Sequence, residues 1–171
     1  SVSPTSTQAV AAELGDYLAD GDQILDGGAC DVGVESTIID CTGDVPKILR
    51  PGAITAQMIV ESTGLKVIGQ TSGDAVVDRN AIRVSGSLEA HYAPVATVVL
   101  DQSPVAGQGF IAMADVVADV GVVRLAAPKT HDEFARVLYS GLRAADEQGL
   151  ATVVVAQPHG DGIAIAIRDR L

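Results

Sequence analysis

The feature that most constrains the fold is a series of short apolar runs after Pro94, because each run is bounded by turn residues. Apolar runs of this length are typical of strands that are buried on both faces of a parallel sheet. The runs are Val95–Leu100, Gly109–Met113, Gly121–Leu125 and Thr152–Ala156. With a helix between the last two, this order predicts a parallel α/β layer with right-handed crossovers.

That helix has the clearest start and stop signals of the chain. Thr130 and Glu133 form a capping box at its start, and Gly149 is expected to end it. A single apolar stripe runs along the helix at helical spacing. Its members are Phe134, Val137, Leu138, Leu142 and Ala145. Residues 163–171 are expected to form a closing helix.

The N-terminal part of the chain mixes helices with short strands. Ser3 and Pro4 suit the N-cap and the first position of a helix that continues to about Leu18. Apolar runs separated by turn residues then predict strands. These runs are Ile24–Leu25, Ser36–Asp40 and Lys47–Arg50. Thr55 is the expected N-cap of a further helix that ends at about Gly64.

Residues 65–95 are rich in Gly, Ser and Thr, which favours an extended connector over a packed element. The predicted organisation is therefore an α+β domain at residues 1–64, this linker, and the α/β domain at residues 96–171. His91 and Tyr92 lie near the end of the linker. An imidazole beside a phenol at that place fits either a flap over a binding site or an anchor that docks the linker.

Polar side chains near the ends of the predicted strands are the candidate site. Glu35-Ser36-Thr37 places three hydrogen-bonding side chains where an apolar strand begins. Arg50 ends the next strand, where a guanidinium suits bidentate binding of phosphate or carboxylate. Its alternative role is a surface salt bridge with one of the many acidic residues. Thr5 suits hydrogen bonding to an anion at a helix N-terminus, or the role of a second capping residue.

Charge and cysteine usage exclude several function classes. The net charge is −11; residues 1–95 carry 13 acidic and 5 basic side chains, and residues 96–171 carry 9 and 6. Neither part offers the basic surface of an electrostatic nucleic-acid binder. Cys30 and Cys41 have neither a CxxC pattern nor a histidine at metal-ligand spacing, which indicates ordinary thiols in a reducing compartment. No apolar run approaches the roughly 18 residues of a membrane span, and we therefore expect a cytoplasmic protein.

Several motifs, taken in order, resemble one enzyme family. They are Ser3-Pro4-Thr5, Leu25–Gly28, Val32–Asp40, Ile48–Ile54, the His91-Tyr92-Ala93-Pro94 segment and Ile167–Leu171. Together they resemble the YrdC-type L-threonylcarbamoyladenylate synthases in their long, two-domain form. The resemblance implies an α/β fold in which part of a YrdC-like domain precedes a small Rossmann-like domain. The first half of that family's catalytic domain has no counterpart here, so we expect part of a longer enzyme that is inactive alone.

The resemblance also implies an activity, that of a nucleotidyltransferase of tRNA processing. Such an enzyme joins L-threonine, bicarbonate and ATP, with Mg²⁺, to threonylcarbamoyl-AMP and pyrophosphate. The product is the activated intermediate for threonylcarbamoyladenosine and passes to downstream tRNA-transfer machinery. By resemblance, Ser36 holds L-threonine, while Arg50 and Thr5 contact the nucleotide. Tyr92, with His91 beside it, closes over the site, and either of the two contacts the ligand. The resemblance assigns no nucleophile and no metal ligand.

Two other functions stay open at this point. Residues 65–171 could form a non-catalytic, Rossmann-like binding or regulatory module. A double-stranded RNA-binding protein of the YrdC type is the other alternative. The net charge counts against RNA binding by this chain, since the basic surface would have to lie in the half that has no counterpart here.

Overall fold

The structure is a computed structural model, and it describes residues 2–69 and 93–171 of the chain. The chain divides by its contacts into two compact units, each made of two segments. The first unit comprises Ser1–Gly33 and Tyr92–Ala156, and the second comprises Val34–His91 and Gln157–Leu171. Most of the predicted linker lies outside the described residues, and the domain boundaries expected from the sequence stay a prediction.

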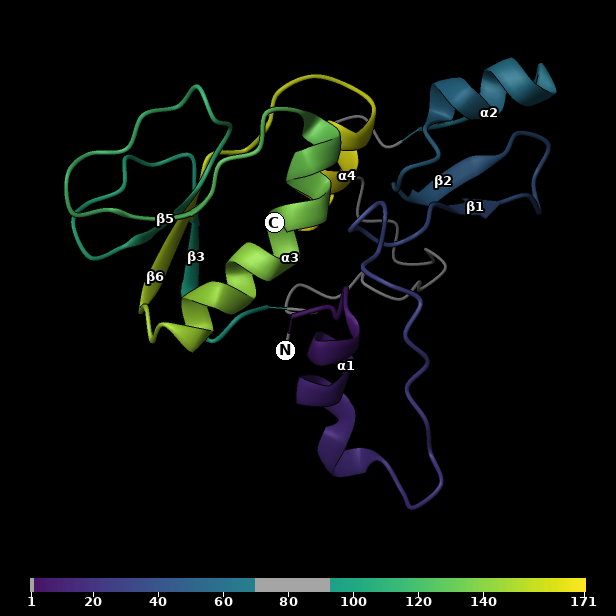
Figure 1. The fold of residues 1–171 in the computed structure, drawn as a ribbon. Coiled ribbons are helices and arrows are strands. Elements are labelled where there is room, and N and C mark those ends of the chain that lie inside the picture. The colour runs from purple at the N-terminus through teal and green to yellow at the C-terminus, as the bar shows by residue number, and fades with distance from the viewer. Residues whose placement is uncertain (1, 70–92) are drawn as a thin grey trace. The chain divides into compact units, whose positions relative to one another are not determined.

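The first unit contains a four-stranded parallel sheet (Figure 1). Its strands are β3 (Thr97–Leu100), β4 (Gly109–Ile111), β5 (Val123–Ala126) and β6 (Thr152–Val155). All four lie inside or beside the predicted runs, so the parallel α/β layer is confirmed. The spatial order is β3-β6-β4-β5, so the last strand of the sequence pairs with the first two.

Helix α3 (His131–Glu147) packs on this sheet along the predicted stripe. Thr130 caps the helix, because its hydroxyl accepts a hydrogen bond from the backbone N–H of Glu133 at 3.1 Å. Four members of the stripe are buried, among them Phe134 with no exposed surface. Gly141 permits close packing, since a Cβ there would lie 2.9 Å from Cδ1 of Ile111.

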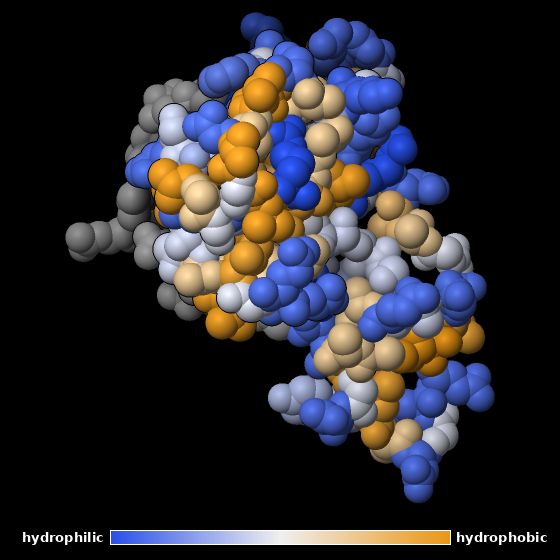
Figure 2. Space-filling model, turned by 60° about the vertical axis from the view of Figure 1, so that its left-hand side comes forward, coloured by the Kyte–Doolittle hydropathy of each residue, from blue (hydrophilic) through white to orange (hydrophobic). Residues whose placement is uncertain are grey.

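The strand residues that alternate with Ile111 form a second, smaller cluster around Phe110. The guanidinium of Arg124 lies 4.8 Å from the centre of the Phe110 ring and donates hydrogen bonds to four backbone carbonyls. Those carbonyls belong to Ala112, Met113, Val116 and Ala126. The loop after β4 also exposes Val117 and Val120. Figure 2 shows one face of the molecule, on which apolar and hydrophilic residues are mixed.

The first helix starts later than the sequence predicted. Helix α1 runs over Thr7–Leu14 and continues as a 3₁₀ turn, η1 (Gly15–Tyr17). Its N-cap is Ser6, whose hydroxyl accepts from the N–H of Ala9 at 3.2 Å. The prediction that Ser3 caps the helix was therefore wrong: Ser6 has the extended backbone of a cap, and its hydroxyl reaches the N–H three residues on.

The predicted strand at Ile24–Leu25 was also wrong. Residues 22–37 form neither helix nor strand, and the side chain of Leu25 is largely exposed. A two-residue apolar run supplies little surface for burial, and no neighbouring strand pairs with it along the described part of the chain.

The second unit is built on a hairpin and two short helices. Strands β1 (Ile38–Asp40) and β2 (Lys47–Arg50) pair antiparallel. Helix α2 (Ala56–Thr63) begins at the cap Thr55 and ends at Gly64, as predicted. Helix α4 (Ile163–Asp169) is the expected closing helix, and it belongs to the same unit as the hairpin.

Candidate functional site

The hairpin brings two of the predicted site residues together. Its register places Arg50, the last residue of β2, opposite Ile38, the first residue of β1. Ser36 lies two residues before Ile38, so the segment leading into β1 runs beside the end of β2. Residues that the sequence separates by 14 positions are therefore neighbours, because antiparallel pairing returns the chain on itself.

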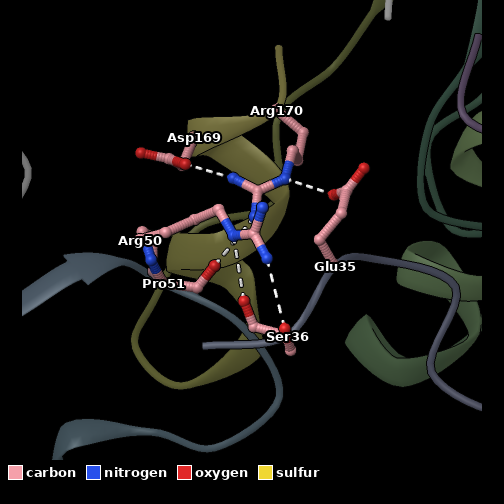
Figure 3. A network of polar contacts seen from close by, with 6 residues as sticks. All are labelled: Glu35, Ser36, Arg50, Pro51, Asp169 and Arg170. Carbon is pink, nitrogen blue, oxygen red and sulfur yellow. Dashed lines mark hydrogen bonds and ion pairs between the residues drawn. The ribbon is translucent and has the colours of Figure 1, made fainter. Parts of the chain in front are cut away.

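Arg50 and Ser36 are directly bonded to each other (Figure 3). The Nε–H of Arg50 donates to the backbone carbonyl of Ser36 at 3.0 Å, and its NH2 group donates to the Ser36 hydroxyl oxygen at 3.2 Å. The arginine is 9% exposed, whereas the serine is exposed. Arg50 is therefore a buried side chain that lies behind an exposed hydroxyl, and its role at the site stays a prediction.

Two further contacts hold the same two segments against each other. The Thr37 hydroxyl donates to the carbonyl of Ile54 at 2.7 Å. A Cβ on Gly52 would lie 2.5 Å from the Thr37 nitrogen and 2.6 Å from the Glu35 carbonyl oxygen. Only a residue without a side chain fits there, because the opposing atoms belong to the backbone. The Pro51-Gly52 motif therefore marks a close backbone approach.

Arg50, Ser36 and Arg170, with the carboxylates of Glu35 and Asp169, form one polar cluster. The sequence did not predict that Arg170 belongs to it. Its Nε pairs with a carboxylate oxygen of Glu35 at 2.6 Å, and its NH2 group donates to the carbonyl of Pro51 at 3.0 Å (Figure 3). The guanidinium also contacts the carboxylate of Asp169. The one available signal was that Arg170 stands in the last motif of the family resemblance, with no indication of its partners.

Burial shapes the electrostatics of this cluster. The pKa of Asp169 is raised above its ordinary value chiefly because burial disfavours the charged form. The neighbouring guanidinium groups of Arg170 and Arg50 act in the opposite direction. Glu35 and Asp169 both contact Arg170, so the cluster combines the two guanidinium groups of Arg50 and Arg170 with two carboxyl groups.

A small cavity borders the cluster within the second unit. Its volume is about 40 Å³, and apolar side chains and glycines form most of its wall. The lining residues include Ile48, Pro51, Gly52, Thr55 and Ile165. A cavity of this size has room for a few water molecules but not for a nucleotide.

The remaining predicted residues are placed differently. Thr5 belongs to the first unit, one position before the cap of α1, where its carbonyl accepts from the N–H of Cys30 at 3.0 Å. The cap is Ser6, and the nucleotide contact expected of Thr5 stays a prediction. His91 and Tyr92 lie outside the described residues.

Within residues 2–69 and 93–171, no group of three or more His, Cys, Asp or Glu side chains is placed to hold a metal ion. Cys30 and Cys41 are exposed free thiols. None of the described helices combines the length and the apolar character needed to cross a bilayer.

Comparison with known families tests the resemblance that the motifs predict. The sequence model of the family described as threonylcarbamoyl-AMP synthase, C-terminal domain, matches residues 54–171, more than half of the chain. The chain belongs to this family. The resemblance drawn from the motifs is thereby confirmed.

Individual relatives of the threonylcarbamoyl-AMP synthase family agree with this assignment. The threonylcarbamoyl-AMP synthases of Bacillus subtilis and Pyrococcus abyssi are 32% and 29% identical to the chain, over 99% of its length. The alignments cover 52% and 53% of those proteins. The chain thus spans about half the length of the curated relatives that it matches.

The fold of this family member also resembles a solved structure. The crystal structure of P. abyssi Sua5 complexed with L-threonine matches 99% of the chain and 53% of the solved one. The TM-score is 0.78 at 28% sequence identity. This likeness supports the mixed α/β fold, with its parallel sheet and its small antiparallel sheet.

Proposed function

We propose that this chain is part of a threonylcarbamoyl-AMP synthase that acts in the formation of threonylcarbamoyladenosine in tRNA. The enzyme would join L-threonine, bicarbonate and ATP, release pyrophosphate and pass its product to tRNA-transfer machinery. Family membership carries the proposal. Because the chain spans about half the length of its relatives, the activity is assigned to a protein of their length that contains it.

The Ser36–Arg50 pair is the proposed L-threonine site. The hydroxyl of Ser36 accepts from Arg50, so its own proton remains to donate to an anionic oxygen. The threonine carboxylate is such an acceptor, and the buried positive charge of Arg50 lies directly behind the hydroxyl. That a relative at 28% identity crystallised in complex with L-threonine supports this assignment.

The nucleotide contacts complete the proposal. Arg50 is assigned to the ATP phosphates because a guanidinium presents several N–H groups to an anion, and Thr5 is assigned a hydrogen bond to the nucleotide. His91 and Tyr92 would close over the site and exclude water from a hydrolysable product. Mg²⁺ would accompany ATP and neutralise charge on pyrophosphate. Glu35 and Asp169 do not form a ready Mg²⁺ site, because both contact Arg170.

In the proposed reaction the protein positions reactants and stabilises charge, and it forms no covalent bond with them. The amine of L-threonine and bicarbonate combine to a carbamate with loss of water. A carbamate oxygen then attacks the α-phosphorus of ATP, and the bond to pyrophosphate breaks. Ser36 would hold the threonine so that the carbamate oxygen faces the phosphorus.

Direct detection of threonylcarbamoyl-AMP tests this function. A protein of the relatives' length that contains this chain is incubated with L-threonine, bicarbonate, ATP and Mg²⁺, and the product is measured by mass spectrometry. We expect product that disappears when either L-threonine or bicarbonate is omitted. The absence of product from a folded protein that still binds ATP would contradict the proposal.

A further inference from the structure

The C-terminal helix reaches the proposed L-threonine site through one side chain. Arg170 follows the last residue of α4, and its side chain is 4% exposed. Its partners Glu35 and Pro51 stand 135 and 119 positions earlier in the sequence. All three residues belong to the second unit, so the contact lies within one compact unit.

The two partners of Arg170 flank the Ser36–Arg50 pair. Glu35 directly precedes Ser36, and Pro51 directly follows Arg50. The Nε–H of Arg170 holds the Glu35 carboxylate at 2.6 Å, while its NH2 group holds the Pro51 carbonyl at 3.0 Å. One rigid guanidinium therefore joins both segments that carry the pair.

From this geometry we propose that Arg170 is a positioning residue for L-threonine binding. It holds the segment that contains Glu35 against the segment that contains Pro51. The Ser36 hydroxyl therefore stays within hydrogen-bond distance of the Arg50 guanidinium. The inference rests on the proposed function, because it assigns Arg170 to the same site. Arg170 itself donates to protein atoms and has no assigned contact with substrate.

Replacement of Arg170 should affect L-threonine more than ATP. In Arg170→Ala the Glu35 carboxylate loses its ion pair, and the Pro51 carbonyl loses its charged donor. We expect the KM for L-threonine to rise by about tenfold or more, since small displacements of a positioning group have effects of this size. The kcat at saturating L-threonine should fall by a smaller factor than the KM rises, because bound L-threonine still presents the same reacting groups.

Variants of the same pair separate positioning from folding. Arg170→Lys keeps the positive charge but cannot bond both partners in fixed geometry, so an intermediate KM is expected. Glu35→Gln keeps the shape of the side chain and removes its charge. Because the two residues touch, the double variant with Arg170→Ala and Glu35→Gln should weaken L-threonine binding by less than the sum of the two single effects.

Arg168 provides the matched control. It lies in α4, two positions before Arg170, and donates to the carbonyls of Pro158 and Gly160. Arg168→Lys tests what an equal change on α4 does through stability alone. A structural effect lowers the amount of active protein without changing the KM for L-threonine, and we expect that result for Arg168→Lys only.

A measurement on Arg50 itself keeps the inference independent of turnover. The side-chain Nε–H signal of Arg50, assigned with Arg50→Lys, should be slow to exchange because it is bonded to the Ser36 carbonyl. In folded Arg170→Ala the exchange should become faster; unchanged exchange and an unchanged KM for L-threonine would overturn the positioning role. A wild-type protein that does not bind L-threonine would instead contradict the proposed function.

Discussion

The parallel sheet and the β1–β2 hairpin differ in what is buried in them. In the sheet, the residues without exposed surface are aliphatic or aromatic, such as Ile111, Val153 and Phe134 on the covering helix. In the hairpin, the buried residues are Ile48 and Arg50. The sheet is therefore stabilised mainly by burial of apolar area, and the hairpin depends on a few charged hydrogen bonds.

This difference indicates where the chain tolerates change. Apolar packing is distributed over many contacts, so a conservative substitution in the sheet leaves the remaining contacts in place. The hairpin site depends on a few bonds made by Arg50, Thr37 and Arg170, and the loss of one partner removes a hydrogen bond that no neighbouring contact duplicates in kind. The region that carries the proposed binding site is thus the more sensitive of the two to single polar changes.

The largest expected effect comes from emptying the core under α3. Phe134→Ala removes a fully buried ring and should lower the free energy of unfolding by about 3–5 kcal/mol. Amide hydrogen exchange of β4 and β6 would report the loss, because these strands lie under the helix. Val117→Ala, at a side chain that is 89% exposed, is the control and should change stability little. Equal losses of stability in the two variants would contradict the claim that burial of apolar area stabilises the sheet.

Gly52→Ala tests the hairpin half of the comparison. A Cβ at this position would collide with backbone atoms of residues 35–37, which no rotamer change relieves. We expect a loss of about 1–3 kcal/mol of stability that exchange measurements place in the hairpin, together with weaker L-threonine binding. Gly43→Ala, where a Cβ meets no atom within 4 Å, is the matched control. If Gly52→Ala binds L-threonine as the wild type does, the close approach of Gly52 to residues 35–37 is not needed for the proposed site.

Local signals account for the features that were predictable. Thr55 and Thr130 were recognised as caps because each bonds the N–H three residues ahead, so the pattern lies in adjacent sequence. The Ser3 prediction failed because Ser6 offers the same chemistry three positions later, and only backbone conformation separates them. The positions of Ser36 and Arg50 at the strand ends were predictable, whereas their mutual bonds followed from the hairpin register.

Long-range contacts account for what was not predictable. Nothing in the local sequence around Arg170 specifies a carboxylate 135 positions earlier, since the contact arises only when α4 joins the hairpin. The order of the strands in the sheet could not be predicted either. The apolar runs predict four strands but contain no information on which strands are neighbours.

The smallest expected effect concerns pH and Asp169. Because burial raises the pKa of this carboxyl in the folded state, the ionised form costs stability. The cost is absent at a pH below the pKa of Asp169 in the unfolded state. It grows as the pH rises from that value to the higher pKa in the folded state, and it is constant above it. Relative to the wild type, Asp169→Asn should therefore gain stability across that range. Urea unfolding at a series of pH values measures the difference, and a difference that does not vary with pH would contradict it.

The affinity of the Ser36→Ala variant for L-threonine tests the central claim most directly. Calorimetric titration of a protein of the relatives' length, with Ser103→Ala as the exposed serine control, measures the Kd for each. The loss of a hydrogen bond to a charged group predicts binding weaker by at least about tenfold for Ser36→Ala. The Ser103→Ala control should bind as the wild type does. If Ser36→Ala also binds L-threonine with wild-type affinity, the hairpin does not hold the amino acid and the site lies elsewhere.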